Sequence, residues 1–103
     1  MNENIIISVT QGNLNNDHIP LTLPINEKFF PDDIFGGESK NEKGKEVLIR
    51  TDLGTRFYTD IASSKRIFRN RGDIGRFLRG RFSSGEKVCI EKISEYEYFL
   101  SKA

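Results

Sequence analysis

Short apolar runs separated by polar turns recur along this chain. Residues 4–9 are mostly apolar and β-branched, and the polar residues 10–18 that follow predict a strand and then a loop. Residues 18–24 alternate apolar and other side chains, and their two prolines restrict the segment to the edge or the end of a sheet. The pattern therefore predicts a second strand there.

The next part of the chain is divided by proline, glycine and charged residues. Residues 25–30 have room for one helical turn, and Phe29 or Phe30 has the bulk to fill one end of a small core. Residues 32–37 predict a turn of the chain. Residues 38–46 contain no apolar side chain, which predicts an exposed connection or hairpin loop.

The second half of the chain has clearer periodicity. Residues 47–50 and 55–61 flank a turn that contains a glycine, which predicts a β-hairpin. Within residues 73–79 the apolar side chains recur at i, i+3 and i+4, which predicts a short amphipathic helix. Residues 87–93 and 96–100 predict two final strands that pair with each other.

Together these segments make six or seven short strands and two short helices, without an internal repeat. The pattern predicts a mostly-β barrel or sandwich. We expect Phe77, Leu78, Val88 and Ile90 to belong to its core.

Length and composition fit a single domain over residues 1–103. With 36% hydrophobic residues, a modest core can form without disulfides or metals. The longest apolar run is Ile5–Ile7, far short of the roughly 20 residues that cross a bilayer, so no membrane span is expected. The first residues do not resemble a secretory signal, and we expect a cytoplasmic protein.

The residues that usually perform chemistry are few. The chain has one histidine, His18, and one cysteine, Cys89, and the cysteine lies within a predicted strand where it behaves as a small hydrophobe. Neither a zinc site nor a catalytic cysteine is expected. The only adjacent acidic pair, Asp32–Asp33, lies in a predicted turn, and no nuclease motif accompanies it. We therefore expect a protein without enzymatic activity, metal or cofactor.

The net charge of +1 conceals a division along the chain. Residues 1–46 carry four Lys/Arg and eight Asp/Glu, whereas residues 47–103 carry twelve and seven. Residues 65–81 hold seven basic side chains, six of them Arg, and one acid. The planar guanidinium of Arg matches phosphate and the edge of guanine, so this segment indicates nucleic-acid binding. The alternative is that the charges form a solvated face.

Several segments together resemble a known family. They are IPLTLP with FFPDDIFGG, then TDIASSKRIFRNR, IGRFL and SSGEKVCIEKISEYEYFLS, which fall in this order between Ile19 and the C-terminus. The chain resembles the DNA-binding pseudobarrel of the plant B-three transcription factors. It resembles more closely their bacterial relatives, which recognise target DNA in certain restriction endonucleases. The resemblance implies a mainly β fold, a seven-stranded open pseudobarrel with two short helices.

The resemblance also implies that two loops enter the major groove of double-stranded DNA. Amides and cationic side chains bind base edges there, and other polar groups bind phosphates. The residues expected to bind bases are Gln11, Asn13, Asn15, Asn16, His18, Ser63, Ser64, Lys65 and Arg66. The residues expected to bind phosphates are Thr10, Arg69, Arg71, Arg76 and Arg79.

Alternatives stay open at this point. One of the arginines could instead pair structurally with Asp60 or Asp73. An RNA-binding β-barrel would stack bases on exposed aromatic residues; its candidates are Phe57, Tyr58, Tyr96 and Tyr98. A protein-interaction module would use the acidic half of the chain. The interpretation that we favour is sequence-specific binding of double-stranded DNA, with any cleavage performed by a nuclease domain or subunit.

Overall fold

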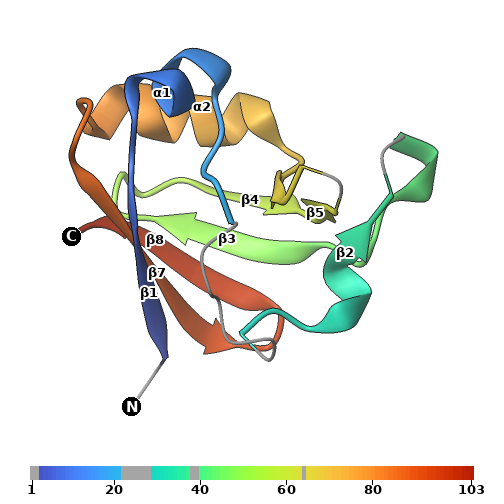
Figure 1. Cartoon of the computed structure of the whole chain (residues 1–103). Helices are drawn as coiled ribbons and strands as arrows, with labels where there is room; N and C mark the ends of the chain where they lie inside the picture. The colour runs from blue at the N-terminus through green and yellow to red at the C-terminus, as the bar shows by residue number, and fades with distance from the viewer. Residues whose placement is uncertain (1–2, 22–28, 38–39, 64) are drawn as a thin grey trace.

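The protein is mainly β, with two α-helices packed side by side (Figure 1). The computed structural model describes residues 3–21, 29–37, 40–63 and 65–103. In chain order the elements are β1 (Asn4–Ser8), α1 (Gln11–Asn16), the 3-10 helix η1 (Asp32–Ile34), β2 (Phe35–Gly36), the 3-10 helix η2 (Lys40–Glu42), β3 (Val47–Thr51), β4 (Arg56–Thr59), β5 (Ile61–Ala62), β6 (Ile67–Phe68), α2 (Arg71–Arg81), β7 (Lys87–Ser94) and β8 (Glu97–Lys102).

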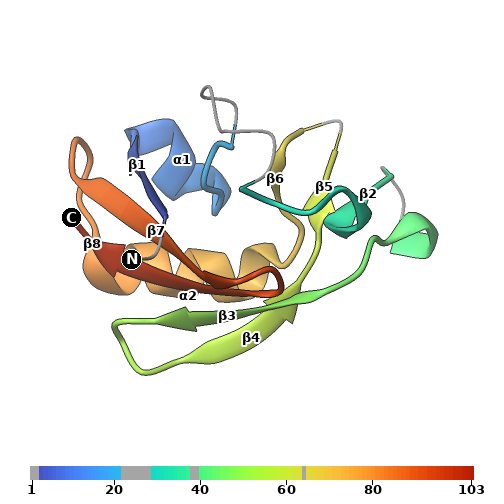
Figure 2. The same cartoon turned by 90° about the horizontal axis from the view of Figure 1, so that it is seen from below.

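The eight strands form two sheets. The larger sheet has the order β1-β7-β8-β3-β4 and is antiparallel except where β3 pairs with β8. The smaller sheet has the order β2-β5-β6 and lies beside the N-terminal end of α2 (Figure 2). The predicted mainly β fold with two helices is confirmed. Within the described residues the strands close no barrel and number eight, so the seven-stranded pseudobarrel is not confirmed.

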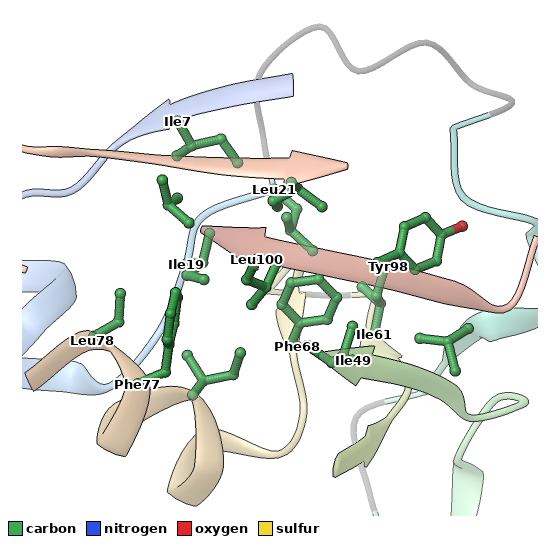
Figure 3. Packing of buried hydrophobic residues seen from close by; sticks show 14 of the residues in the cluster. Ile7, Ile19, Leu21, Ile49, Ile61, Phe68, Phe77, Leu78, Tyr98 and Leu100 are labelled. Atoms are coloured by element: carbon green, nitrogen blue, oxygen red, sulfur yellow. The ribbon is translucent and has the colours of Figure 1, made fainter. Parts of the chain in front are cut away.

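One hydrophobic core joins both sheets and α2 (Figure 3). Alternate side chains of β3 and β8 are buried, and the apolar stripe of α2 packs against them. Phe77, Leu78, Val88 and Ile90 are each at most 1% exposed, which confirms them as core residues. Phe29 and Phe30 are both buried against the ring of Tyr98, so the prediction that one of them fills the end of the core is also confirmed.

The first correction concerns residues 10–18, which were predicted as a polar loop but contain the helix α1. Thr10 caps α1, because its Oγ1 accepts a hydrogen bond from the Asn13 amide at 3.1 Å. Asn13 Oδ1 accepts the Thr10 amide in return, at 2.9 Å. This is a capping box with Asn in the place usually taken by Glu or Gln, and it satisfies two amides that a helix start leaves unpaired. The polar composition of this segment therefore does not indicate a loop, because its side chains form the hydrogen bonds that start the helix.

Four further predictions of secondary structure differ from what is observed. Residues 18–21 form no strand, while residues 22–24 and the first four residues of the predicted turn at 25–30 lie outside the described part. The turn at 32–37 contains η1 and β2, and the loop at 38–46 contains η2. The predicted helix at 73–79 is the middle of the longer α2, whose N-cap Asn70 accepts a hydrogen bond from the Asp73 amide. The hairpin of β3 and β4 and the pair β7–β8 are confirmed.

A buried ion pair explains why the strand predicted at 55–61 divides at Asp60. Asp60 is 1% exposed, and its Oδ1 and Oδ2 accept hydrogen bonds from Arg69 Nε and Nη2 at 2.7 and 3.1 Å. Asp60 Oδ2 also accepts the Gly44 amide at 2.8 Å, and Arg69 Nη2 donates to the Gly37 carbonyl at 2.6 Å. The carboxylate thus faces inward between β4 and β5, and the chain passes there from one sheet to the other.

Removal of Asp60 should destabilise the fold strongly. In Asp60→Ala the guanidinium of Arg69 stays largely buried without its carboxylate, so we expect a loss of about 3–5 kcal/mol in the free energy of unfolding. Urea denaturation of the wild type and the variant measures the difference.

The matched control is Arg76→Ala. Arg76 pairs with Asp73 at 2.6 Å, but its side chain is 69% exposed, so its removal should cost at most about 1 kcal/mol. Equal losses in the free energy of unfolding for the two variants would mean that the Asp60–Arg69 pair stabilises the fold no more than an exposed ion pair does.

Candidate nucleic-acid interface

A groove of about 560 Å³ lies between the two segments that the sequence analysis assigns to DNA recognition. One wall comes from the end of α1 and the segment that follows it, and the other from the turn between β5 and β6, with the start of α2 between them. The groove is lined by Asn16, His18, Pro20, Lys65, Ile67 and Arg71. We call this surface the inter-wall groove.

The first wall is held by contacts between α1 and α2. Asp17 ends α1 in the left-handed conformation, with φ of 56°, and its carboxylate pairs with Arg79 of α2. A Cβ atom at Gly75 would lie 2.5 Å from Asp17 Cγ, so only glycine permits this close approach. Arg71 donates from Nη2 and Nε to the Asn16 carbonyl at 2.8 and 3.2 Å. These contacts fix the end of α1 on α2 and bring Arg71 to the groove.

The second wall is the turn between β5 and β6. Ser63 donates from its amide and its Oγ to the Gly36 carbonyl, at 3.0 and 2.6 Å. The Arg66 amide donates to the Ala62 carbonyl at 2.8 Å and closes the turn. Lys65 is exposed on the groove and forms no hydrogen bond or ion pair with any residue that the structure describes. Its ammonium group is therefore available to an anionic ligand.

The groove combines two cations with an uncharged imidazole. Burial lowers the pKa of His18 below its ordinary value of 6.5, and the positive charges of Arg71 and Lys65 lower it further, against a weaker opposite effect of Asp17. His18 is therefore neutral near pH 7, with one nitrogen that donates and one that accepts hydrogen bonds. The site offers neutral groups for base edges next to cations for phosphates.

The structure gathers four of the predicted site residues at the inter-wall groove, namely Asn16, His18, Lys65 and Arg71. Gln11 and Asn15 lie on the exposed side of α1, where Gln11 Nε2 donates to Asn15 Oδ1 at 3.0 Å. Thr10 and Asn13 form the capping box, and Asn13 is only 8% exposed. Ser63 lies on the turn, and Ser64 lies outside the described residues.

Most of the other predicted arginines have partners within the protein. Arg69 is bound in the buried pair with Asp60, and Arg76 pairs with Asp73, which is the structural alternative that the sequence left open. Arg66 Nε donates to the Leu21 carbonyl at 3.2 Å. The basic segment is thus mainly a set of anchors, and Lys65 is the cation left without such a bond within the described part.

Sequence reasoning missed the apolar lining of the groove. Pro20 and Ile67 lie between its polar groups, and Ile67 directly follows the basic turn in the sequence. No local pattern marked these two residues, because Pro20 lies between Ile19 and Leu21 and Ile67 is followed by Phe68.

The aromatic residues proposed for RNA stacking are mostly inaccessible. Phe57 is 8% exposed and Tyr98 is fully buried, while the Tyr96 hydroxyl donates to Asp33. Tyr58 on β4 is 59% exposed, the most accessible of these four aromatic residues.

Among residues 3–21, 29–37, 40–63 and 65–103, no group of three or more His, Cys, Asp or Glu side chains lies in a position to hold a metal ion. No helix in the described ranges is long and apolar enough to cross a membrane. Cys89 is half-buried, and burial raises the pKa of its thiol.

Comparison with known proteins shows the fold. No protein-family model matches the chain, and no curated protein is similar to it. Among solved structures, the fold is similar to the N-terminal domain of LlaJI.R1 from Helicobacter pylori, a restriction-related protein. The two share 17% sequence identity with a TM-score of 0.63, over 97% of this chain and 86% of that one. At this identity the likeness is one of fold.

The electrostatics of the groove can be tested without a ligand. Because His18 is the only histidine, its imidazole gives one titrating signal in a proton NMR series. We expect its pKa below 6.5, and a higher pKa in Lys65→Ala, since that variant removes one of the two cations that disfavour the imidazolium. An unchanged pKa in this variant would show that Lys65 does not face His18.

Proposed function

We propose that the chain binds double-stranded DNA in a sequence-specific manner through the inter-wall groove. The observation that carries this proposal is the convergence of Asn16 and His18 with Lys65 and Arg71, from segments more than forty positions apart in the sequence. Amide, imidazole and ammonium groups are those that recognise base edges in the major groove. The fold similarity to a domain of a restriction-related protein supports the same proposal.

The groups divide by chemistry. We assign the base edges to Asn16, His18 and Lys65, because neutral donors and acceptors and a mobile ammonium discriminate between bases. We assign phosphates to Arg71, whose remaining guanidinium N–H groups lie beside the groove. Gln11, Asn15 and Ser63 would extend the base contacts, and Arg76 and Arg79 would extend the phosphate contacts from α2. Ser64, which lies outside the described residues, stays a predicted base contact.

We further propose that this fold is a distant variant of the B-three pseudobarrel and serves as a recognition module. In this proposal the chain performs no cleavage, and a nuclease domain or subunit supplies it in a restriction system. The two walls would then insert into the major groove, with the partly exposed Pro20 available for contact with the methyl group of thymine.

Selection from a randomised duplex DNA pool tests this function directly. We expect one short motif to be enriched at both about 50 and 200 mM salt, because base contacts persist where counterion release no longer favours binding. If DNA binds without enrichment of any motif, and this binding disappears at the higher salt, the groove attracts DNA by charge alone and recognises no sequence. Preferential capture of single-stranded RNA in a competition would instead favour a role for Tyr58.

Lys65→Ala tests the assignment of the tip residue. We expect it to weaken discrimination at one base pair by about 1–3 kcal/mol, measured by competition between the selected site and its single-base variants. The matched control is Arg56→Ala, which also removes one positive charge but at an exposed position of β4. A uniform loss over all sequences in Lys65→Ala would reassign Lys65 to a phosphate.

A further inference from the structure

Arg66 holds an unusual position in the turn that forms the second wall. Its φ of 53° places it in the left-handed region, which residues other than glycine, asparagine and aspartate rarely adopt. Such a conformation persists where the surrounding contacts determine it. Contacts beyond the hydrogen bond that closes the turn therefore hold Arg66 in this conformation.

Those contacts lead across the groove to the first wall. The Leu21 amide donates to the Arg66 carbonyl at 2.8 Å, and Arg66 Nε donates to the Leu21 carbonyl at 3.2 Å. The side-chain N–H thus replaces the backbone N–H that a neighbouring strand would provide. Two hydrogen bonds therefore join the segment after α1 to the residue directly before β6.

Both ends of this connection are anchored. Leu21 is 1% exposed and belongs to the hydrophobic core. On the other side, the Arg66 guanidinium carbon lies 5.7 Å from the ring centre of Phe35 in β2, within the range of a cation–π contact. The Arg66 amide is bound to Ala62 in β5. The bonds therefore join the core to the smaller sheet.

We propose that Arg66 is a positioning residue that latches the two walls of the inter-wall groove and sets their separation. The latch itself is a property of the free protein, while its effect on specificity rests on the proposed function. With the walls held at one distance, the neighbouring Lys65 and the opposite Asn16 reach base pairs in a fixed register. Arg66 then determines sequence preference without itself reading a base.

Two substitutions separate this role from direct contact with DNA. Arg66→Gln places an amide nitrogen at the position of Arg Nε, so it keeps the donor to Leu21 and loses the charge. Arg66→Lys keeps the charge and has a methylene group at that position, so it loses the donor. A latch requires the donor, whereas a contact to guanine or to phosphate requires the cation.

The first measurement uses the protein without DNA. We expect the Leu21 amide to exchange its hydrogen at least about tenfold faster in Arg66→Lys than in the wild type. In Arg66→Gln, which keeps the donor but loses the contact with Phe35, we expect a much smaller increase. Arg56→Lys and Arg56→Gln are matched controls on β4 and should leave this rate unchanged. Thermal unfolding of each variant verifies that it is folded. Unchanged exchange in Arg66→Lys would overturn the latch, whatever happens with DNA.

The second measurement is the ratio of affinities for the selected site and a scrambled duplex. A positioning role predicts that Arg66→Lys lowers this ratio about tenfold, with preference lost at several base pairs, while Arg66→Gln weakens both duplexes alike. If Arg66→Gln lowers the affinity ratio more than Arg66→Lys does, and the preference is lost at one base pair only, Arg66 contacts a base and the proposal is overturned. If the wild type selects no DNA sequence while the exchange rates follow the first expectation, the latch stands and the proposed function fails.

Discussion

The buried pair of Asp60 and Arg69 determines where the other elements can lie. A carboxylate that is 1% exposed is tolerated only when its oxygens are fully hydrogen-bonded, and Asp60 obtains these bonds from Arg69 and the Gly44 amide. The segments that meet there are the β4–β5 junction, the loop after β2 and the approach to α2. At Gly36 a Cβ atom would lie 2.5 Å from Asp60 Oδ2, so the tight packing extends to the backbone itself. The start of α2 beside the smaller sheet, and with it the position of the inter-wall groove, follows from this pair.

Most of the positive charges in the basic segment, residues 65–81, are bound within the protein, so their number does not measure the charge available to a ligand. Four of its seven cations pair with an aspartate. Arg76 pairs with Asp73 on the same helix, whereas the other three pairs join separate elements: Arg69 with Asp60, Arg79 with Asp17 and Arg81 with Asp52. Arg66 and Arg71 donate to backbone carbonyls. An arginine can satisfy such a bond and still present charge, because its fork carries five N–H groups. Lys65 forms no hydrogen bond or ion pair with the described residues, so its charge is the most available one in this segment.

Periodicity predicted the elements that alternate or repeat over a sufficient length, such as the β3–β4 hairpin, β7, β8 and the centre of α2. It failed for α1, because the capping box of Thr10 and Asn13 depends on two specific hydrogen bonds and not on apolar spacing. It failed at Asp60, because the division of the strand depends on Arg69, nine positions later. For the candidate site, the residue types near both walls were apparent, but four of the predicted residues gather at the groove and others serve the fold. Which arginine has an acidic partner is a question of tertiary structure that spacing does not answer.

In the proposed function, the groove would select its ligand by geometry more than by charge. Lys65 and Arg71 are the two cations of its lining and the chain has a net charge of +1, so long-range attraction to DNA would be modest. Affinity for DNA would then come from short-range contacts that depend on geometry, and such contacts need walls that do not move apart. Burial first, and the same two cations next, lower the pKa of His18 in the free protein, and a phosphate placed beside it would raise this pKa by compensating the cations. If DNA places a phosphate beside His18, binding is coupled to the uptake of a proton by the imidazole, and the affinity rises as the pH falls. If His18 instead contacts a base edge, the imidazole stays neutral on binding. The pH dependence of the affinity therefore distinguishes the two positions of DNA in the groove.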